Sequence, residues 1–133
     1  MVPAVIEAWK SMLASHDPAL LDRLIADDAV FESPVVHTPQ AGKAKTALYL
    51  AAADAVLNNG SFRYVAEWYS DRSAVLEFNA QLDGLLVDGV DMIWWNEDDR
   101  IVRFKVMVRP LKAIEALHAR MAQELARRLA MPR

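Results

Sequence analysis

Residues 89–104 read GVDMIWWNEDDRIVRF, and the rest of the chain can be interpreted outward from them. The first part of this stretch is a run of large apolar residues interrupted by one acid, Asp91. The polar run Asn96–Asp99 has the composition of a tight turn, and apolar and polar residues alternate again from Val102. The stretch therefore predicts two antiparallel strands joined by a short turn, the first of them apolar on both faces.

The segment that precedes this stretch, from Phe62 onward, also alternates with a period of two. Turn residues at Ser70-Asp71 and Asp83-Gly84 divide it into two further strands. Between Leu76 and Leu82 every second residue is apolar and its neighbours are polar or acidic, which indicates one buried face and one wetter face. The chain from Phe62 to Arg109 therefore predicts a four-stranded antiparallel meander.

Helices are predicted on both sides of this meander. Apolar residues at three- and four-residue spacing, an Asp17 cap followed by Pro18, and an alanine-rich run that ends at Asn58-Asn59-Gly60 mark their positions. The predicted helices cover residues 5–13, 18–25, 43–57 and 111–125. A short strand is predicted over residues 29–32. The adjacent acids Asp27 and Asp28 are interpreted as a solvated helix end.

Composition limits the classes of protein to consider. The chain has 133 residues, of which 54% are apolar, so we expect a single domain over residues 1–133. A formal net charge of −3 gives no positive excess for nucleic acid or acidic membranes. No apolar run reaches the roughly 20 residues of a membrane span, and Glu7 and Lys10 interrupt the opening residues before signal-peptide length. Together with the absence of cysteine, these features lead us to expect a cytoplasmic protein.

Neither a metal nor a cofactor is expected. His16, His37 and His118 lie far apart, and none stands at a metal-ligand spacing from a carboxylate. The four glycines are isolated, so the sequence contains no phosphate loop, dinucleotide-binding fingerprint or nucleophile elbow.

The order helix, helix, strand, helix and four-stranded meander is similar to the cone-shaped fold of the nuclear-transport-factor-2-like (NTF2-like), or SnoaL-like, superfamily. Besides residues 89–104, the resemblance depends on Leu24–Val30 (LIADDAV), Ser33-Pro34 and Gly42. The run Val106–Ile114 (VMVRPLKAI) resembles a group of mostly uncharacterised bacterial members. The resemblance implies an α+β, cystatin-like fold, in which a curved antiparallel sheet wraps around the N-terminal helices and a C-terminal helix follows it. An apolar pocket is expected inside the cone.

Ketosteroid isomerases of this superfamily carry an Asp five positions before an Asn, as Asp91 and Asn96 stand here. The resemblance implies that Asp91 is a carboxylic acid kept protonated by an apolar site, a case known for that enzyme. Their catalytic base, however, falls on Ser33, and the tyrosine that partners the acid falls on Trp9. Serine is not a base at neutral pH, so isomerisation of ketosteroids by that mechanism is not expected.

Polyketide cyclases of the superfamily pair a sheet Asp with a nearby His, and His37 follows the first predicted strand. We therefore predict Asp91 and His37 as catalytic candidates, with a solvated surface position as the alternative for His37. The pocket is predicted to be lined by the following residues, although core packing is the default for large aromatics: Trp9, Ser33, Trp68, Ile93, Trp95 and Phe104.

Three functional hypotheses follow. In the first, an apolar small molecule binds in the pocket and an isomerase, cyclase or lyase reaction takes place on an apolar carbonyl compound. In the second, the pocket binds such a ligand without catalysis, and in the third the chain is a dimeric interaction module. A homodimer is predicted through the outer sheet face, at Met92, Trp94 and Met107, with cover by the C-terminal helix as the alternative.

Overall fold

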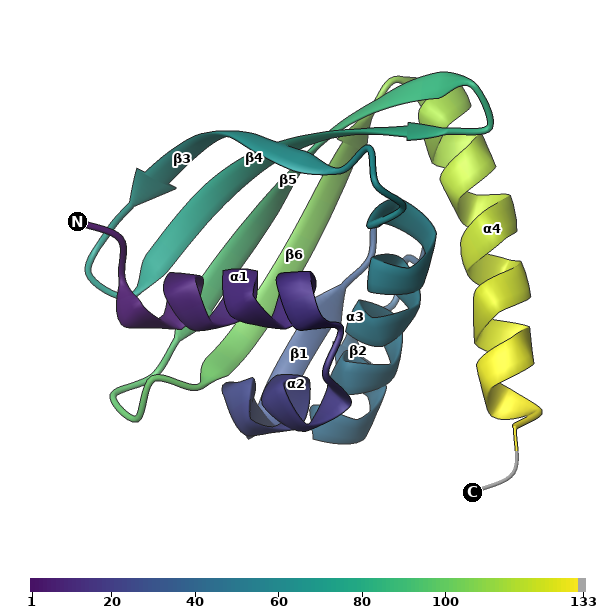
Figure 1. Cartoon of the computed structure of the whole chain (residues 1–133). Helices are drawn as coiled ribbons and strands as arrows, with labels where there is room; N and C mark the ends of the chain where they lie inside the picture. Colours follow the sequence, from purple (N-terminus) through teal and green to yellow (C-terminus); the bar gives the residue numbers. More distant parts are fainter. Residues whose placement is uncertain (132–133) are drawn as a thin grey trace.

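The computed structural model describes residues 1–131, which form four helices and one six-stranded sheet. The helices are α1 (Ala4–Ser15), α2 (Pro18–Leu24), α3 (Lys43–Leu57) and α4 (Leu111–Leu129). The strands are β1 (Ile25–Glu32), β2 (Gln40–Ala41), β3 (Arg63–Tyr69), β4 (Ser73–Leu82), β5 (Leu85–Trp95) and β6 (Ile101–Arg109). Figure 1 shows α1 crossing the concave side of the curved sheet, with α3 and α4 side by side at one end. The chain is therefore an α+β fold of the predicted type.

The sheet has the strand order β2-β1-β6-β5-β4-β3. Strands β3 to β6 pair antiparallel in sequence order, which confirms the predicted meander. Strand β1, however, pairs parallel to β6, so the sheet is mixed and differs at this one pairing from the antiparallel sheet that the resemblance implied. The direction of β1 depends on a pairing with a distant strand, and the apolar pattern of β1 carries no information about that direction.

The junction of α2 and β1 also differs from the prediction. The helix ends at Leu24, and the strand begins at once with Ile25. Asp27 and Asp28 therefore lie in the strand and not at a helix end. They are exposed, and they fall where the pairing of β1 with β6 is irregular, between Ile25 and Val30. This irregularity lets two consecutive acids face water inside a strand whose other residues are largely buried.

Gly42 positions α3 against β1. Its φ of 99° lies in the left-handed region that favours glycine. In this conformation the Gly42 amide donates to the Ala29 carbonyl at 2.7 Å. One turn into the helix the hydroxyl of Thr46, a buried residue, donates to the same carbonyl at 3.3 Å. The two bonds fix the start of α3 beside the strand that leads into the cavity described below.

The core lies between the concave face of the sheet and the helices. The predicted inward-facing residues of β4 are all buried: Leu76, Phe78, Ala80 and Leu82. Burial of each large side chain of this kind stabilises the fold by roughly 1.5–3 kcal/mol. Within residues 1–131 no helix is both long and apolar enough to cross a membrane.

Candidate functional site

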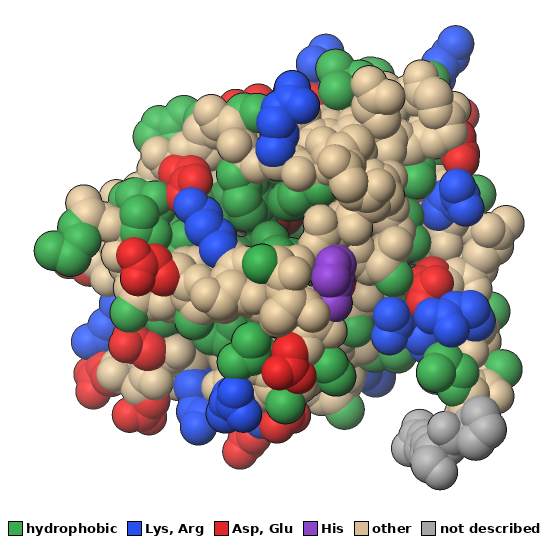
Figure 2. Space-filling view, in the orientation of Figure 1, with side chains coloured by type: hydrophobic (Ala, Val, Ile, Leu, Met, Phe, Trp, Pro, Cys, Tyr) green, Lys and Arg blue, Asp and Glu red, His purple; other side chains and the backbone are tan. Residues whose placement is uncertain are grey.

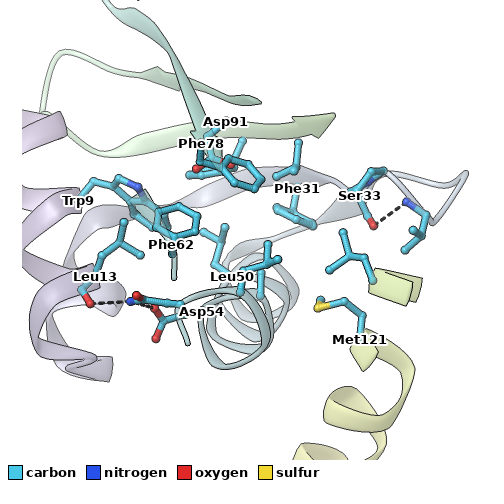
Figure 3. Close-up of a pocket in the computed structure, with 18 of the residues that line it drawn as sticks. Trp9, Leu13, Phe31, Ser33, Leu50, Asp54, Phe62, Phe78, Asp91 and Met121 are labelled. Carbon is cyan, nitrogen blue, oxygen red and sulfur yellow. Dashed lines mark hydrogen bonds between the residues drawn. The ribbon is translucent and has the colours of Figure 1, made fainter. Parts of the chain in front are cut away.

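A cavity of about 50 Å³ lies inside the cone, between the concave face of the sheet and α1, α3 and α4. In Figure 3 its wall runs from Trp9 and Leu13 on α1 to Ser33 after β1 and Met121 on α4. Figure 2 shows a recess on this side of the molecule with hydrophobic side chains inside it. The wall is strongly aromatic, with the rings of Trp9, Phe31, Phe62, Tyr64, Phe78 and Phe104. Such a wall suits an apolar ligand.

Asp91 is the acid that the inner face of β5 presents to this cavity. The pairing of Asp91 with Leu76 and Val106 places it among inward-facing residues, and its side chain is 6% exposed. Burial disfavours the charged form and raises the pKa of Asp91 from 3.8 to about 7, although the Tyr64 hydrogen bond opposes the shift. The carboxyl group therefore exchanges its proton near neutral pH.

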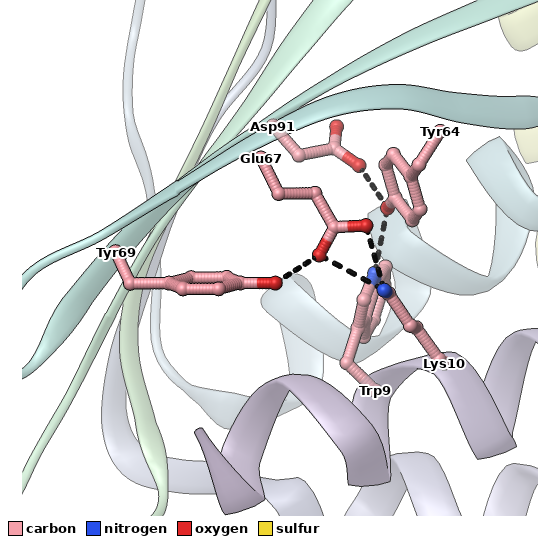
Figure 4. Close-up of polar contacts among 6 residues, drawn as sticks. All are labelled: Trp9, Lys10, Tyr64, Glu67, Tyr69 and Asp91. Carbon is pink, nitrogen blue, oxygen red and sulfur yellow. Dashed lines mark hydrogen bonds and ion pairs between the residues drawn. The ribbon is translucent and has the colours of Figure 1, made fainter. Parts of the chain in front are cut away.

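Asp91 belongs to a short chain of hydrogen bonds (Figure 4). The Tyr64 hydroxyl on β3 donates to Asp91 Oδ2 at 2.5 Å, and the Trp9 indole Nε1 on α1 donates to the Tyr64 oxygen at 2.8 Å. Burial, and then the charge of Asp91, hold the pKa of Tyr64 well above its usual value of 10. Tyr64 therefore remains protonated across the pH range in which Asp91 titrates.

A second polar cluster ties α1 to β3 beside this chain (Figure 4). Lys10 Nζ lies 2.9 and 2.7 Å from the two carboxylate oxygens of Glu67, and the Tyr69 hydroxyl donates to the same carboxylate. Burial disfavours the charge on Glu67, but the hydrogen bonds from Lys10 and Tyr69 outweigh it and lower its pKa. The bond to Glu67 raises the pKa of Tyr69 to about 12. The cluster holds α1 in place where Trp9 meets Tyr64.

At the other end of α1, a polar contact with α3 closes the wall. Asn58 Nδ2 donates to the Leu13 carbonyl and to Asp54 Oδ1, both at 2.8 Å. The second oxygen of Asp54 lies 2.6 Å from His16 Nδ1. Leu13, Asp54 and Asn58 all line the cavity. His16 therefore contacts a residue of the wall.

Ser33, the residue at the position of the family's base, lines the cavity together with Phe104. The Ser33 Oγ accepts a hydrogen bond from the Val35 amide at 3.1 Å, so the hydroxyl stabilises the loop after β1. A neutral hydroxyl in this arrangement supplies no base.

Ile93 and Trp95 share the inward face of β5 with Asp91, and both are buried. They belong to the core and do not line the cavity. His37 does not line it either: the side chain is exposed, in the loop between β1 and β2. His37 therefore has the solvated surface position that was the alternative prediction for it, and it is not among the residues that line the cavity with Asp91.

The prediction that Trp68 lines the cavity is also wrong, since 58% of the residue is exposed. The cause is a bulge in β3. Tyr64 pairs with Phe78, but the next pair is Ala66 with Glu77, so Val65 is an extra residue in the strand. The extra residue reverses the facing of all that follow. Trp68 consequently turns to the outer face, while Tyr64, before the bulge, turns inward.

Tyr64 is the functional residue that the sequence analysis missed. Its signal was present, because Phe62, just before β3, and Tyr64 within it are aromatic residues two positions apart, and both line the cavity. The pairing of Tyr64 with Asp91 is nevertheless non-local, across 27 residues of sequence. No group of three or more His, Asp or Glu side chains that could hold a metal ion occurs within the part of the chain that the structure describes.

Comparisons with known proteins identify the fold family. The chain matches the family described as the SnoaL-like domain over residues 6–104. It is similar to the crystal structure of a steroid delta-isomerase from Pseudomonas aeruginosa, at 38% identity over 96% of this chain and 93% of that one, with a TM-score of 0.89. A search of curated proteins found no match.

Two further solved structures are similar to this chain. An uncharacterised bacterial protein with a cystatin-like fold from Silicibacter pomeroyi is 29% identical over 90% of this chain and 84% of that one, with a TM-score of 0.82. An NTF2-like protein of unknown function from Mesorhizobium loti, at 23% identity, shares the fold over 80% of this chain and 88% of that one, with a TM-score of 0.69. With residues 6–104 matched to the family and a 38% identical relative of nearly equal length, the chain belongs to the SnoaL-like domain family of the NTF2-like superfamily.

Proposed function

We propose that the protein binds a small apolar carbonyl compound in the cavity and that Asp91 donates a proton to it, or accepts one from it, in an isomerase, cyclase or lyase reaction. The observation that carries the proposal is the Asp91 carboxyl group, which is 6% exposed in an aromatic cavity and has its pKa raised to about 7. A group that changes protonation near the working pH is suited to general acid or base chemistry.

The surroundings of Asp91 favour a neutral, largely apolar ligand. Among residues 1–131, none of those that line the wall is Lys or Arg, so this part of the chain offers no cation there to bind a carboxylate or phosphate. The neutral form of Asp91 donates one hydrogen bond, which matches a carbonyl oxygen. The name of the 38% identical relative from Pseudomonas aeruginosa, a steroid delta-isomerase, supports a reaction of the isomerase type.

A second candidate function is ligand binding without turnover. The Ser33 hydroxyl accepts a hydrogen bond from the Val35 amide and the His37 side chain is exposed, so neither of the two residues that the family comparisons pointed to supports a second proton-transfer step beside Asp91. Asp91 would then orient the ligand through a hydrogen bond only.

Thermal-shift screening with apolar ketones at pH 6 and pH 8 tests the proposed function. A ligand at 100 times its Kd stabilises the folded protein by about 2.7 kcal/mol. We expect larger shifts at pH 6, where Asp91 is mostly neutral, and a smaller shift for Asp91→Asn. Mass spectrometry of the recovered compound then separates the two candidates, because a catalyst alters the compound and a binder returns it intact. Unchanged affinity and turnover in Asp91→Asn would contradict both.

We further propose a homodimer through the outer sheet face, at Met92, Trp94 and Met107. Met107 is 49% exposed, and the Arg103 guanidinium lies 4.3 Å from the centre of the Trp94 ring on this face. The position of Leu117 of α4 at the cavity, on the opposite, concave side of the sheet, favours this dimer over the alternative of cover by α4.

Sedimentation velocity at micromolar concentration tests the dimer. We expect the wild-type protein to sediment as a dimer and Met107→Lys to shift it toward monomer. Leu129→Lys on α4, at a site that is 68% exposed, is the matched control and should leave the dimer intact. A wild-type monomer under these conditions would refute this proposal.

A further inference from the structure

We infer that Trp9 is a positioning residue: its indole N–H fixes the direction of the Tyr64 hydroxyl, so that Oδ1 of Asp91 is the single atom that exchanges a proton with a ligand in the cavity. The inference deepens the proposed function by naming the reacting atom and the residue that selects it. It rests on the hydrogen-bond chain Trp9, Tyr64 and Asp91 (Figure 4).

The direction of the chain starts at Trp9. An indole N–H can donate a hydrogen bond but cannot accept one. At 2.8 Å from Trp9 Nε1, the Tyr64 oxygen must therefore be the acceptor. The Tyr64 proton then has to point elsewhere, and the acceptor that the structure places within reach is Asp91 Oδ2 at 2.5 Å.

The reverse direction would leave a donor without a partner. If a protonated Asp91 donated from Oδ2 to Tyr64, the phenolic oxygen would accept two bonds and its own proton would need a third group. Trp9 Nε1 has no lone pair to offer. The carboxylate of Glu67 is bonded to Lys10 and Tyr69, and among the described residues no hydrogen bond joins it to Tyr64. A buried hydroxyl proton left in this way is costly, so the chain keeps one direction.

It follows that Oδ2 of Asp91 accepts from Tyr64 whether the acid is charged or neutral. The titrating proton must then reside on Oδ1, on a side chain that lines the cavity. The Tyr64 hydroxyl is occupied at both ends and is not available to a ligand. A ligand therefore meets one donor when Asp91 is neutral and one acceptor when it is charged. This arrangement fits a single carbonyl or enol oxygen, and it does not fit a carboxylate, which would require a second donor.

Carboxyl ¹³C NMR titration of the ligand-free protein tests the role of Trp9. In Trp9→Phe the ring remains but the N–H is lost, so Tyr64 can turn and accept from neutral Asp91. We expect the pKa of Asp91 to rise by about 0.5 to 1 pH unit, the size of one ordinary hydrogen bond. Tyr64→Phe should raise it as well. The double variant should match Tyr64→Phe alone, because Trp9 acts only through Tyr64.

Trp95→Phe is the matched control, since it shortens another buried tryptophan on the strand that carries Asp91. We expect the pKa of Asp91 to remain at the wild-type value in this control. An equal response of Trp9→Phe and Trp95→Phe would overturn the inference, and so would additive effects of the Trp9 and Tyr64 substitutions.

A measurement on the wild-type protein covers the case in which Trp9→Phe does not fold. The Trp9 indole N–H should remain protected from solvent exchange at both pH 5.5 and pH 8.5, on either side of the Asp91 transition. The exposed Trp68 indole provides the comparison. If the indole N–H of Trp9 exchanged with solvent as fast as that of Trp68 at either pH, the fixed direction of the hydrogen-bond chain would be refuted. These measurements use no ligand, whereas the proposed function is tested by ligand binding and turnover. The inference and the proposed function can therefore fail independently.

Discussion

Replacing Asp91 with asparagine removes the charge that the apolar cavity disfavours and keeps an oxygen for the Tyr64 hydrogen bond. The pKa of Asp91 is raised from 3.8 to about 7 in the folded protein, a difference of about three pH units. At roughly 1.36 kcal/mol for each unit, ionisation of Asp91 costs the folded state about 4 kcal/mol. The asparagine amide brings its own cost in an apolar site. That cost does not change with pH, so the pH dependence isolates the carboxyl group.

The sign of the effect follows from proton uptake. Below the unfolded pKa of about 3.8, both states carry the proton and Asp91 imposes no penalty. Between about pH 4 and pH 7 the folded state holds a proton that the unfolded state has lost, so the wild-type stability falls as the pH rises. Above pH 7 the full penalty applies. The free energy of unfolding of Asp91→Asn relative to wild type should therefore rise by roughly 2 to 4 kcal/mol from pH 4 to pH 8.

Urea unfolding followed by circular dichroism, in steps from pH 4 to pH 8.5 at constant protein concentration, measures this difference. Other titrating groups are common to both proteins and cancel in the comparison. Asp71→Asn, in the exposed turn between β3 and β4, is the control and should give a curve parallel to wild type. If the Asp91→Asn curve is also parallel, burial of the carboxyl group does not set its protonation, and the chemistry assigned to it is wrong.

Three substitutions test the frame around the cavity. In Gly89→Ala the added Cβ would lie 2.5 Å from the Phe78 ring, so we expect a loss of about 1–3 kcal/mol in urea unfolding, whereas a neutral result would mean that the ring can move aside. Leu76→Ala removes a fully buried side chain that lies beside Asp91 on the neighbouring strand and should cost about 2–5 kcal/mol in the same assay, and a loss below 1 kcal/mol would contradict the assigned packing. Asn58→Ala removes the hydrogen bond from the end of α3 to the Leu13 carbonyl of α1, together with the bond to Asp54 within α3, and should cost roughly 1–2 kcal/mol. The rate of amide hydrogen exchange in α1 should rise in Asn58→Ala. An unchanged rate would show that other contacts hold the helix in place.

Most of the helices and strands could be predicted from residues close together in the sequence. The meander from β3 to β6 followed from period-two alternation and turn residues, because strands joined by short turns pair with their neighbours in sequence. The start of α2 followed from Asp17 before Pro18, and Asp17 indeed accepts from the Ala19 amide at 2.9 Å. The inward direction of Asp91 did not follow from alternation, because residues 90–95 are apolar on both faces; it was expected from the resemblance to ketosteroid isomerases, and in the structure Asp91 lies on the buried face of β5.

Two of the errors, in the direction of β1 and in the facing of Trp68, lie where distant parts of the chain meet. The parallel direction of β1 is set by its pairing with β6, and the outward turn of Trp68 is set by one extra residue in β3. Both are matters of strand register, which a single strand does not encode. The exposed position of His37 depends on the path of a loop, where no periodicity exists to guide prediction.

The sequence by itself determined the α+β class and the meander, because these depend on residues close together in the chain, and it marked one acid, Asp91, within the apolar run of β5. Only the tertiary structure decided what that acid can do. Its hydrogen-bond partner Tyr64 lies 27 residues away, and Trp9, which donates to Tyr64, lies a further 55 residues from it. The protonation of Asp91 depends on the water that these neighbours exclude and on the bonds that they direct, and both arise only when the sheet closes around α1.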